Sequence, residues 1–248
     1  VFDMKNYDVI FVGGSLMASA TAYSLLNENP HLNILLIEKD STYKYAATPL
    51  ALGGIRQQFS ERTNIRMAKS SVYVYENFGE LMETKTFGKP DIDLRQGGYL
   101  FLVDESKWPI ALENAAVQKE EGVDLKILSV SDLQSMLPET DLTGIVGGTI
   151  CHKEGVLDPA SVLDGYLHKV RELGAEIIND EVIGIKVEHG KIASLTCKSG
   201  SEYSSAVVVN SAGPWAKEIG NMIGVEIPVE PLAHDLFVAR MPMDANVG

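Results

Sequence analysis

The chain has 248 residues, 45% hydrophobic and 22% charged, and its 34 acidic against 21 basic residues give a formal net charge of -13. This composition is that of a globular protein with enough apolar material for a substantial core, in one large domain or two smaller ones. The sequence contains no run of lysine or arginine that could follow a phosphate backbone, which argues against a nucleic-acid partner. We interpret the acidic surplus as a solvated surface and draw no inference from it about a substrate.

The two cysteines, Cys151 and Cys197, form neither a CxxC pair nor a cluster with histidine. Neither a disulfide framework nor a metal site is therefore expected. No apolar stretch reaches the ~20 residues that a helix needs to cross a bilayer, and the first residues lack the apolar segment of a secretory signal. Together these features predict a soluble, cytoplasmic protein.

The first forty residues predict a strand, a turn, a helix and a second strand. Tyr7–Val12 (YDVIFV) is a largely apolar run, typical of a buried parallel strand, and a Gly-Gly-Ser turn interrupts it. Leu16–Leu26 is rich in alanine and leucine and predicts a helix that ends before Pro30. Asn33–Glu38 (NILLIE) predicts another buried strand.

The middle of the chain predicts a mixture of helices and strands. Residues 41–60 are rich in small residues and lack periodicity, which indicates a functional loop. The elements expected after this loop are a long helix at 62–84, a strand at 97–103, a helix at 105–121, a short helix at 131–137 and a strand at 145–153.

The last third of the chain returns to helices alternating with strands. Asp158 and Pro159 are typical of an N-cap and a first helical position, and Gly174 of a helix end, so residues 160–173 predict a helix. The elements expected next are strands at 175–178, 182–188, 191–198 and 203–209, a helix at 213–223 and a strand at 236–240. This pattern predicts an α/β fold: a doubly wound nucleotide domain of separate segments with a second domain inserted.

The turn at residues 13–18 has the spacing of a dinucleotide-binding motif. Such a turn needs small residues at three positions, because the backbone must approach a pyrophosphate and the helix must pack close to the strand. Gly13, Ser15 and Ala18 occupy these positions. Glu38 ends the second strand, where an acid accepts hydrogen bonds from a ribose 2′-OH and would repel the extra phosphate of NADP. The order of elements therefore favours a dinucleotide site over a purely structural βαβ unit.

Four segments resemble the family of FAD-dependent amine and amino-acid oxidoreductases, which includes sarcosine oxidase, glycine oxidase, dimethylglycine dehydrogenase and D-amino-acid oxidase. In chain order they are YDVIFVGGSLMASATAYSLL with LLIEKD, ATPLALGGIRQQFS (47–60), EGVLDP (154–159) and VVVNSAGPWA (207–216). The resemblance implies FAD as the cofactor. It implies a Rossmann-like FAD-binding domain made of residues 1–90 and 145–228, and a partial, mixed α+β substrate domain made of residues 91–144 and 229–248.

The resemblance also implies which residues bind the FAD. These residues are Gly13, Gly14, Ser15, Leu16, Met17, Glu38, Lys39, Ala47, Thr48, Gly53, Gly54, Ile55, Val182, Ser211, Ala212, Gly213 and Trp215. In the family, the loop with the two adjacent glycines runs beneath the isoalloxazine, and the backbone at the position of Val182 contacts the adenine.

Arg56, Gln57 and His234 are the candidate catalytic residues. Arg56 and Gln57 follow the glycines of the loop and could meet the flavin or a substrate carboxylate, because arginine binds carboxylates bidentately. The alternative is a solvated pair at a helix start. His234 lies where related enzymes enter the sheet of the substrate domain, so the resemblance implies that it could face the flavin; the alternative is a partly exposed structural histidine.

The activity that the resemblance implies is oxidation of the C–N bond of a small amine or amino acid such as sarcosine, glycine or proline, by hydride transfer to flavin N5. Two alternatives stay open: an FAD-dependent dehydrogenase of a hydroxy acid or polyol phosphate, and a non-catalytic FAD-binding subunit. Oxygen, a quinone and another flavoprotein are all compatible electron acceptors.

Family members continue beyond the strand at 236–240, whereas this sequence stops at Gly248. The C-terminal part of the expected fold is therefore missing from the sequence. Three explanations are open: a fragment, a partner chain that completes the site, or a reduced family member.

Overall fold

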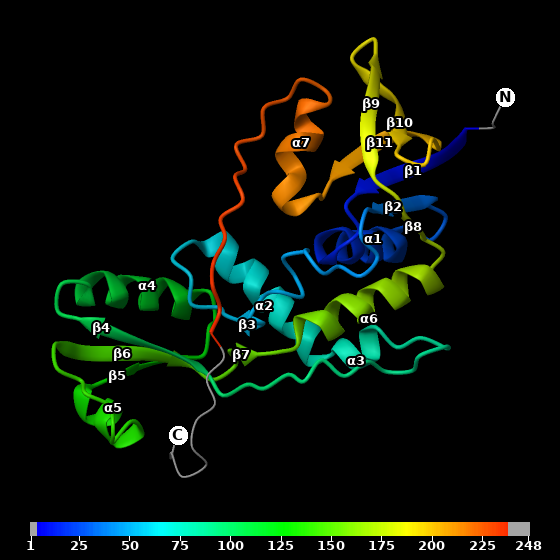
Figure 1. Cartoon of the computed structure of the whole chain (residues 1–248). Coiled ribbons are helices and arrows are strands. Elements are labelled where there is room, and N and C mark those ends of the chain that lie inside the picture. The colour runs from blue at the N-terminus through cyan, green and yellow to red at the C-terminus, as the bar shows by residue number, and fades with distance from the viewer. Residues whose placement is uncertain (1–3, 238–248) are drawn as a thin grey trace. The chain divides into compact units, whose positions relative to one another are not determined.

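The computed structural model describes residues 4–237, which form two compact units (Figure 1). Of the described residues, the first unit contains residues 4–52, Gly79–Ile92 and Pro159–Ala233, and the second contains Gly53–Phe78, Asp93–Asp158 and residues 234–237. Residues 53–78 and 145–158 thus group with the second unit, whereas the sequence assigned them to the FAD-binding domain. Strand pairing explains the difference, because both segments join sheets of the second unit.

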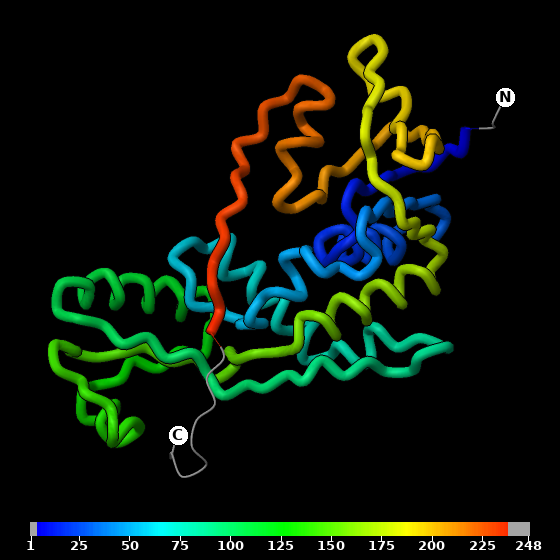
Figure 2. The backbone as a smooth tube through the Cα atoms, viewed as in Figure 1, coloured from blue at the N-terminus to red at the C-terminus, as the bar shows by residue number. Residues whose placement is uncertain are grey.

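The first unit contains a six-stranded sheet in the order β8-β2-β1-β11-β10-β9. Its strands are β1 (Lys5–Val12), β2 (Ile34–Glu38), β8 (Glu176–Asn179), β9 (Val182–Glu188), β10 (Lys191–Cys197) and β11 (Glu202–Asn210). Four strands run parallel to one another, namely β1, β2, β8 and β11. An antiparallel hairpin of β9 and β10 completes the sheet. Figure 2 shows the chain start running beside the yellow and orange segment that follows much later in the sequence.

Successive residues of β1 pack into different cores on the two faces of this sheet, as the two-residue period of a strand requires. Phe11 joins a core with Ala22 of helix α1 (Leu16–Glu28) and Val170 of helix α6 (Pro159–Glu172). Ile10 packs on the opposite face with Leu35 and other apolar residues. Because both faces are covered there, the last four residues of β1 are all apolar and buried, and the predicted strand-turn-helix-strand is confirmed.

The second unit is built on a three-stranded antiparallel sheet. Its order is β4-β6-β5, with β4 (Tyr99–Asp104), β5 (Leu125–Leu128) and β6 (Ile145–Cys151). The helices of this unit are α2 (Arg62–Glu76), α4 (Trp108–Glu120) and α5 (Val130–Met136). A separate two-stranded ladder joins β3 (Gly54–Ile55) to β7 (Gly155–Val156).

Several expected elements differ from the structure for local reasons. The long helix expected at 62–84 ends at Glu76, where Asn77 turns its side-chain amide onto the Tyr73 carbonyl, and a short helix α3 (Phe78–Leu81) follows. The helix expected at 213–223 opens as a 3-10 turn η1 (Gly213–Trp215) before α7 (Ala216–Asn221), because Gly213 has a φ of +53° that an α-helix cannot contain.

Two further differences from the expected elements concern single strands. Strand β5 was not expected, because four residues of mixed polarity give a weak pattern. Of the strand expected at 236–240, Leu236 and Phe237 have no regular structure, and residues 238–240 lie outside the described residues.

Both cysteines are buried free thiols. Within residues 4–237, no group of histidine, cysteine and acidic side chains is arranged to hold a metal ion. None of the helices in that range combines the length and hydropathy needed to cross a membrane.

Candidate functional site

A cavity of about 490 Å³ lies in the first unit where the carboxyl ends of three parallel strands meet. Val12 of β1 is paired with Ile37 of β2 on one side and with Asn210 of β11 on the other, so the segments after these strands converge. From β1 the chain continues to β2, while β11 occupies the other side, which makes this a topological switch point. Open α/β sheets bind their ligands at such points.

The turn after β1 is packed directly against the end of β11. Gly13 has a φ of +93°, and a Cβ atom at this position would lie 2.5 Å from the Ser211 carbonyl oxygen. Ser211 in turn donates its hydroxyl hydrogen bonds to the carbonyl oxygens of Gly13, at 2.8 Å, and Val12, at 3.1 Å. Only glycine fits this position, on conformational and on steric grounds.

The carboxylate of Glu38 ties the same turn to the end of β2. Its two oxygens accept hydrogen bonds from the main-chain amides of Gly14, at 2.8 Å, and Asp40, at 3.0 Å. The carboxylate lines the cavity, and each oxygen retains a further lone pair that could accept a hydroxyl. Glu38 is therefore held in place by the protein while it faces a ligand.

The N-terminus of α1 opens into the cavity. Ser15 is the N-cap, but its hydroxyl contacts Thr48 Oγ1 at 3.3 Å and does not cap the helix amides. No acidic side chain occupies the first turn of this 13-residue helix. The first-turn amides and the positive end of the helix dipole are thus left for an anion such as a pyrophosphate.

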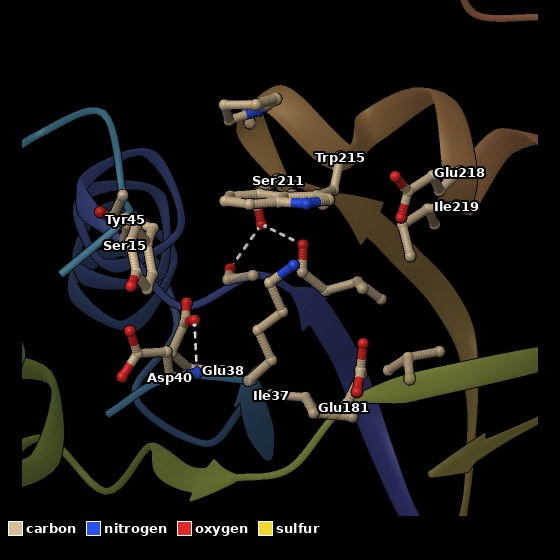
Figure 3. Close-up of a pocket in the computed structure, with 18 of the residues that line it drawn as sticks. Ser15, Ile37, Glu38, Asp40, Tyr45, Glu181, Ser211, Trp215, Glu218 and Ile219 are labelled. Atoms are coloured by element: carbon tan, nitrogen blue, oxygen red, sulfur yellow. Dashed lines mark hydrogen bonds between the residues drawn. The ribbon is translucent and has the colours of Figure 1, made fainter. Parts of the chain in front are cut away.

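Trp215 and Lys39 form an aromatic and cationic side of the cavity. The Lys39 ammonium lies 3.4 Å from the centroid of the indole ring, a cation–π contact. In Figure 3, Trp215 lies across the cavity directly over Ser211, and Glu38 and Asp40 lie on the other side. The indole therefore presents a flat apolar surface of the kind on which a base can stack.

Two ionisable groups beside this cavity have shifted pKa values. A hydrogen bond from the Thr42 hydroxyl lowers the pKa of Asp40, so this carboxylate is charged at neutral pH. Burial, followed by the nearby charge of Glu38, raises the pKa of Tyr43 to about 12, so the phenol stays neutral. The cavity therefore combines several negative charges with a single lysine among its described lining residues.

The cavity contains most of the residues expected to bind FAD. Those that line it are Gly13, Ser15, Leu16, Met17, Glu38, Lys39, Ala47, Thr48, Val182, Ser211, Ala212, Gly213 and Trp215. Gly14 contributes through its amide to Glu38, whereas Gly53, Gly54 and Ile55 belong to the second unit. A volume of this size falls within the ~300–1,000 Å³ of cofactor sites. The glycine turn, free helix amides, acid and indole fit the ADP half of FAD.

Sequence reasoning missed several lining residues. They are Tyr43, Tyr45 and Ala46 in the loop, Asp180, Glu181 and Ile183 before and in β9, and Glu218, Ile219 and Met222 in and after α7. Two aromatics in a small-residue loop were the only signal for the first group. The others reach the cavity through tertiary packing, which no local pattern reports.

In the second unit, Arg56 lines an open hollow of about 560 Å³ with residues of α2 and with Tyr99. Its guanidinium carbon lies 4.7 Å from the ring centroid of Phe59 and 5.6 Å from that of Phe101. The arginine side chain is thus exposed but braced by two aromatic rings.

The other two candidate catalytic residues have different surroundings. Gln57 is only 4% exposed, and its side-chain amide points to the Cys151 sulfur at 3.8 Å, so its placement favours a structural role. His234 is exposed, in a stretch without regular structure that groups with the second unit.

Comparison with known proteins gives a consistent assignment. A family model described as FAD dependent oxidoreductase matches residues 8–247. FAD-dependent oxidoreductase domain-containing protein 1 of Xenopus laevis is 28% identical over 271 residues, covering 96% of this chain and 54% of the relative. Sarcosine oxidase subunit beta of Rhizobium meliloti (strain 1021) is 25% identical over 243 residues, covering 95% of this chain and 56% of the relative.

Solved structures share the fold. L-proline dehydrogenase from P. horikoshii superposes with a TM-score of 0.77 and 24% identity, over 90% of this chain and 57% of that protein. The expected α/β fold is thereby confirmed. The chain spans about half the length of the curated relatives it matches.

Proposed function

The chain belongs to the FAD dependent oxidoreductase family, and we propose that its protein oxidises the C–N bond of a small amine or amino acid such as sarcosine, glycine or proline. When bound, FAD supplies the redox chemistry by accepting, at N5, a hydride from the carbon that bears nitrogen. The resulting imine is then hydrolysed by water. The cavity at the switch point of the parallel sheet is the observation that carries this proposal.

In this proposal each group around the cavity contacts one part of the ADP moiety. The α1 amides meet the pyrophosphate, to which the Gly13 turn allows close backbone approach. The Glu38 carboxylate accepts the ribose hydroxyls through its remaining lone pairs. The indole of Trp215 would offer a flat surface to the adenine, and Lys39 would supply a positive charge for a phosphate.

Arg56 provides the contact to a substrate carboxylate. Within the described chain its guanidinium contacts the rings of Phe59 and Phe101, which leaves its hydrogen-bond donors free for a bidentate carboxylate. Aromatic contacts also restrict the arginine rotamers, which lowers the entropy lost when a substrate binds. An amino acid or an N-substituted glycine carries the carboxylate that this arrangement suits.

Two other readings share the same cavity. A 2-hydroxy acid presents the same carboxylate to Arg56, so a hydroxy-acid dehydrogenase is the second candidate. A subunit that binds FAD and works with a partner is the third, and a relative whose name contains "subunit beta" supports keeping it. The two buried free thiols accord with a reducing compartment, and the cytoplasmic location stays a prediction.

The test is an absorbance spectrum of the full-length protein purified with added FAD. We expect a flavin band near ~450 nm that bleaches anaerobically with sarcosine, glycine or proline. Bleaching by a hydroxy acid but by no amine would favour the second candidate. Bound flavin that no substrate reduces without a partner would favour the third, and protein that takes up no FAD would refute all three.

A further inference from the structure

Glu154 is a fully buried carboxylate in the second unit, outside the cavity described above. Its side chain is 0% exposed, although a carboxylate is among the side chains that proteins rarely bury without a partner. One carboxylate oxygen accepts hydrogen bonds from the main-chain amides of Gln57 and Gln58, the latter at 2.8 Å. The other accepts one from the side-chain amide of Gln58 at 2.7 Å. Among the described residues, the three groups that donate hydrogen bonds to Glu154 are therefore all neutral amides.

Gln58 extends this network into the central sheet of the second unit. Its side-chain nitrogen also donates to the Tyr99 carbonyl oxygen of β4 at 2.9 Å, and its oxygen accepts from the Thr149 hydroxyl of β6 at 2.7 Å. Both polar atoms of the Gln58 side chain are thus oriented by fixed partners. The carboxylate and the amide together attach the loop after Arg56 to two strands.

The segment around Glu154 holds the other side of Arg56 as well. Ile55 pairs with Gly155 in the β3–β7 ladder, and the Leu157 amide donates to the Gly53 carbonyl oxygen at 3.0 Å. Residues 154–157 therefore clamp residues 53–55 through the main chain and residues 57–58 through a carboxylate. Arg56 is the residue between these two sets of contacts.

A buried charge of this kind is poor evidence of stabilisation, because desolvation of a carboxylate offsets much of what its hydrogen bonds contribute. What the charge does provide is direction, since two adjacent main-chain amides must point at one oxygen. We propose that Glu154 is a positioning residue that fixes the backbone on the C-terminal side of Arg56 and so aims the guanidinium into the hollow. The consequence for catalysis rests on the carboxylate role proposed for Arg56.

The test is Glu154→Gln in the full-length protein with FAD bound. An amide of the same shape cannot accept from all three donors, because its own nitrogen would face one of them. We expect faster hydrogen exchange in a peptide covering residues 53–60, with unchanged exchange around residues 7–38. The KM of an amino-acid substrate should rise about tenfold at nearly constant kcat, as expected when a binding group is misplaced. The KM of a small amine without a carboxylate should not change.

Leu133→Ala is the matched control, because Leu133 is also a buried residue of the second unit, but it lies on α5 and has no polar side-chain atom that could hold the loop. It should lower the melting temperature without changing either KM. Equal exchange at 53–60 in Glu154→Gln and in the parent protein would overturn the proposal. So would a KM unchanged by Glu154→Gln but raised by Arg56→Met. If Arg56→Met also leaves KM unchanged, the carboxylate role of Arg56 is refuted, and the exchange measurement alone decides the positioning role.

Discussion

The cavity of the first unit and the clamped loop of the second unit present their functional groups by different physical means. In the cavity, main-chain amides and one carboxylate come together because parallel strands end side by side. In the loop, one arginine is presented by a short segment that is held by a carboxylate 97 residues further along the chain. Topology thus organises the first region, and specific long-range contacts organise the second.

This difference explains which departures from a motif each region tolerates. Ser15 and Ala18 stand at positions that are glycine in the usual dinucleotide turn. Their small side chains are accommodated because the backbone provides the ligand contacts. Gly13 has no such freedom, since its Cβ would collide with Ser211. In the clamp, Gly155 is equally restricted and Glu154 has no neutral equivalent that accepts the same three hydrogen bonds.

The largest expected effect is that of Gly155→Ala. A Cβ atom there would collide with the Arg95 carbonyl oxygen, so the bridge between Arg95 and Val156 must separate. We expect a loss of about 3 kcal/mol in the free energy of unfolding, measured by urea denaturation, because backbone cannot move aside as a side chain can. Gly184→Ala is the control: it is also a strand glycine, but the nearest atom to its Cβ would be 3.9 Å away. Similar losses for both variants would contradict the tight contact.

Gly13→Ala tests the cavity in the same way. Both the positive φ and the Ser211 carbonyl oppose a side chain at this position, so the turn must move away from the place where a pyrophosphate binds. We expect FAD affinity to fall about a hundredfold, measured by flavin fluorescence titration. Gly190→Ala places the same residue at a φ of +75° with nothing within 4 Å of its Cβ. It should cost stability but leave FAD affinity unchanged.

Arg56→Met separates the two regions. We expect kcat/KM for an amino-acid substrate to fall about thirtyfold, because one charge-assisted contact is lost, while FAD affinity is retained. Arg56→Lys keeps the charge and the aromatic contacts but not the bidentate geometry, and it should recover only part of the loss. A parallel loss of FAD affinity in either variant would mean that this residue contacts the cofactor, and the substrate role would then be wrong.

The same contrast decides how much could be predicted from the sequence. The strand-turn-helix-strand and Glu38 could be predicted because their signals are local. The hydrophobic period of each element, the small residues of the turn and the acid at its fixed spacing all lie within forty residues. The fold and the FAD assignment followed from them and from three later segments, and both are confirmed. The segment after β11 lines the same cavity, and two of its lining residues, Ser211 and Trp215, are among those predicted from the sequence.

The clamp shows what the sequence could not provide. GGIRQQFS and EGVLDP are separate motifs in the sequence, and no pattern in either indicates that Glu154 reaches the amides of Gln57 and Gln58. In the sequence, Arg56 and Gln57 are equivalent candidates, yet Arg56 lines the hollow and the side chain of Gln57 points to the buried Cys151. Side-chain direction in a loop depends on tertiary partners, and here these partners come from a segment far along the chain.

The smallest expected effect concerns a carboxylate outside both regions, and it sharpens the contrast with buried Glu154. Hydrogen bonds from Arg66 and then Arg62 lower the pKa of Glu121 from 4.5 to about 2. Since the folded-state pKa is below the unfolded one, this contribution to stability is complete above pH ~4.5 and is lost as the pH falls toward ~2. The ion pairs of Glu121 with Arg62 and Arg66 lie near solvent, so added salt should also weaken them.

Glu121→Gln should therefore lower the melting temperature slightly at pH 7, by an amount that shrinks as the pH falls below ~4.5. Glu113→Gln, on helix α4, controls for the removal of one negative charge from an acidic protein. Hydrogen exchange at residues 53–60 should not respond to Glu121→Gln, because this carboxylate ties α4 to α2 and does not contact the loop at Arg56. A response as large as that of Glu154→Gln would mean that charge on the second unit, and not the directed contact of one carboxylate, orders the loop.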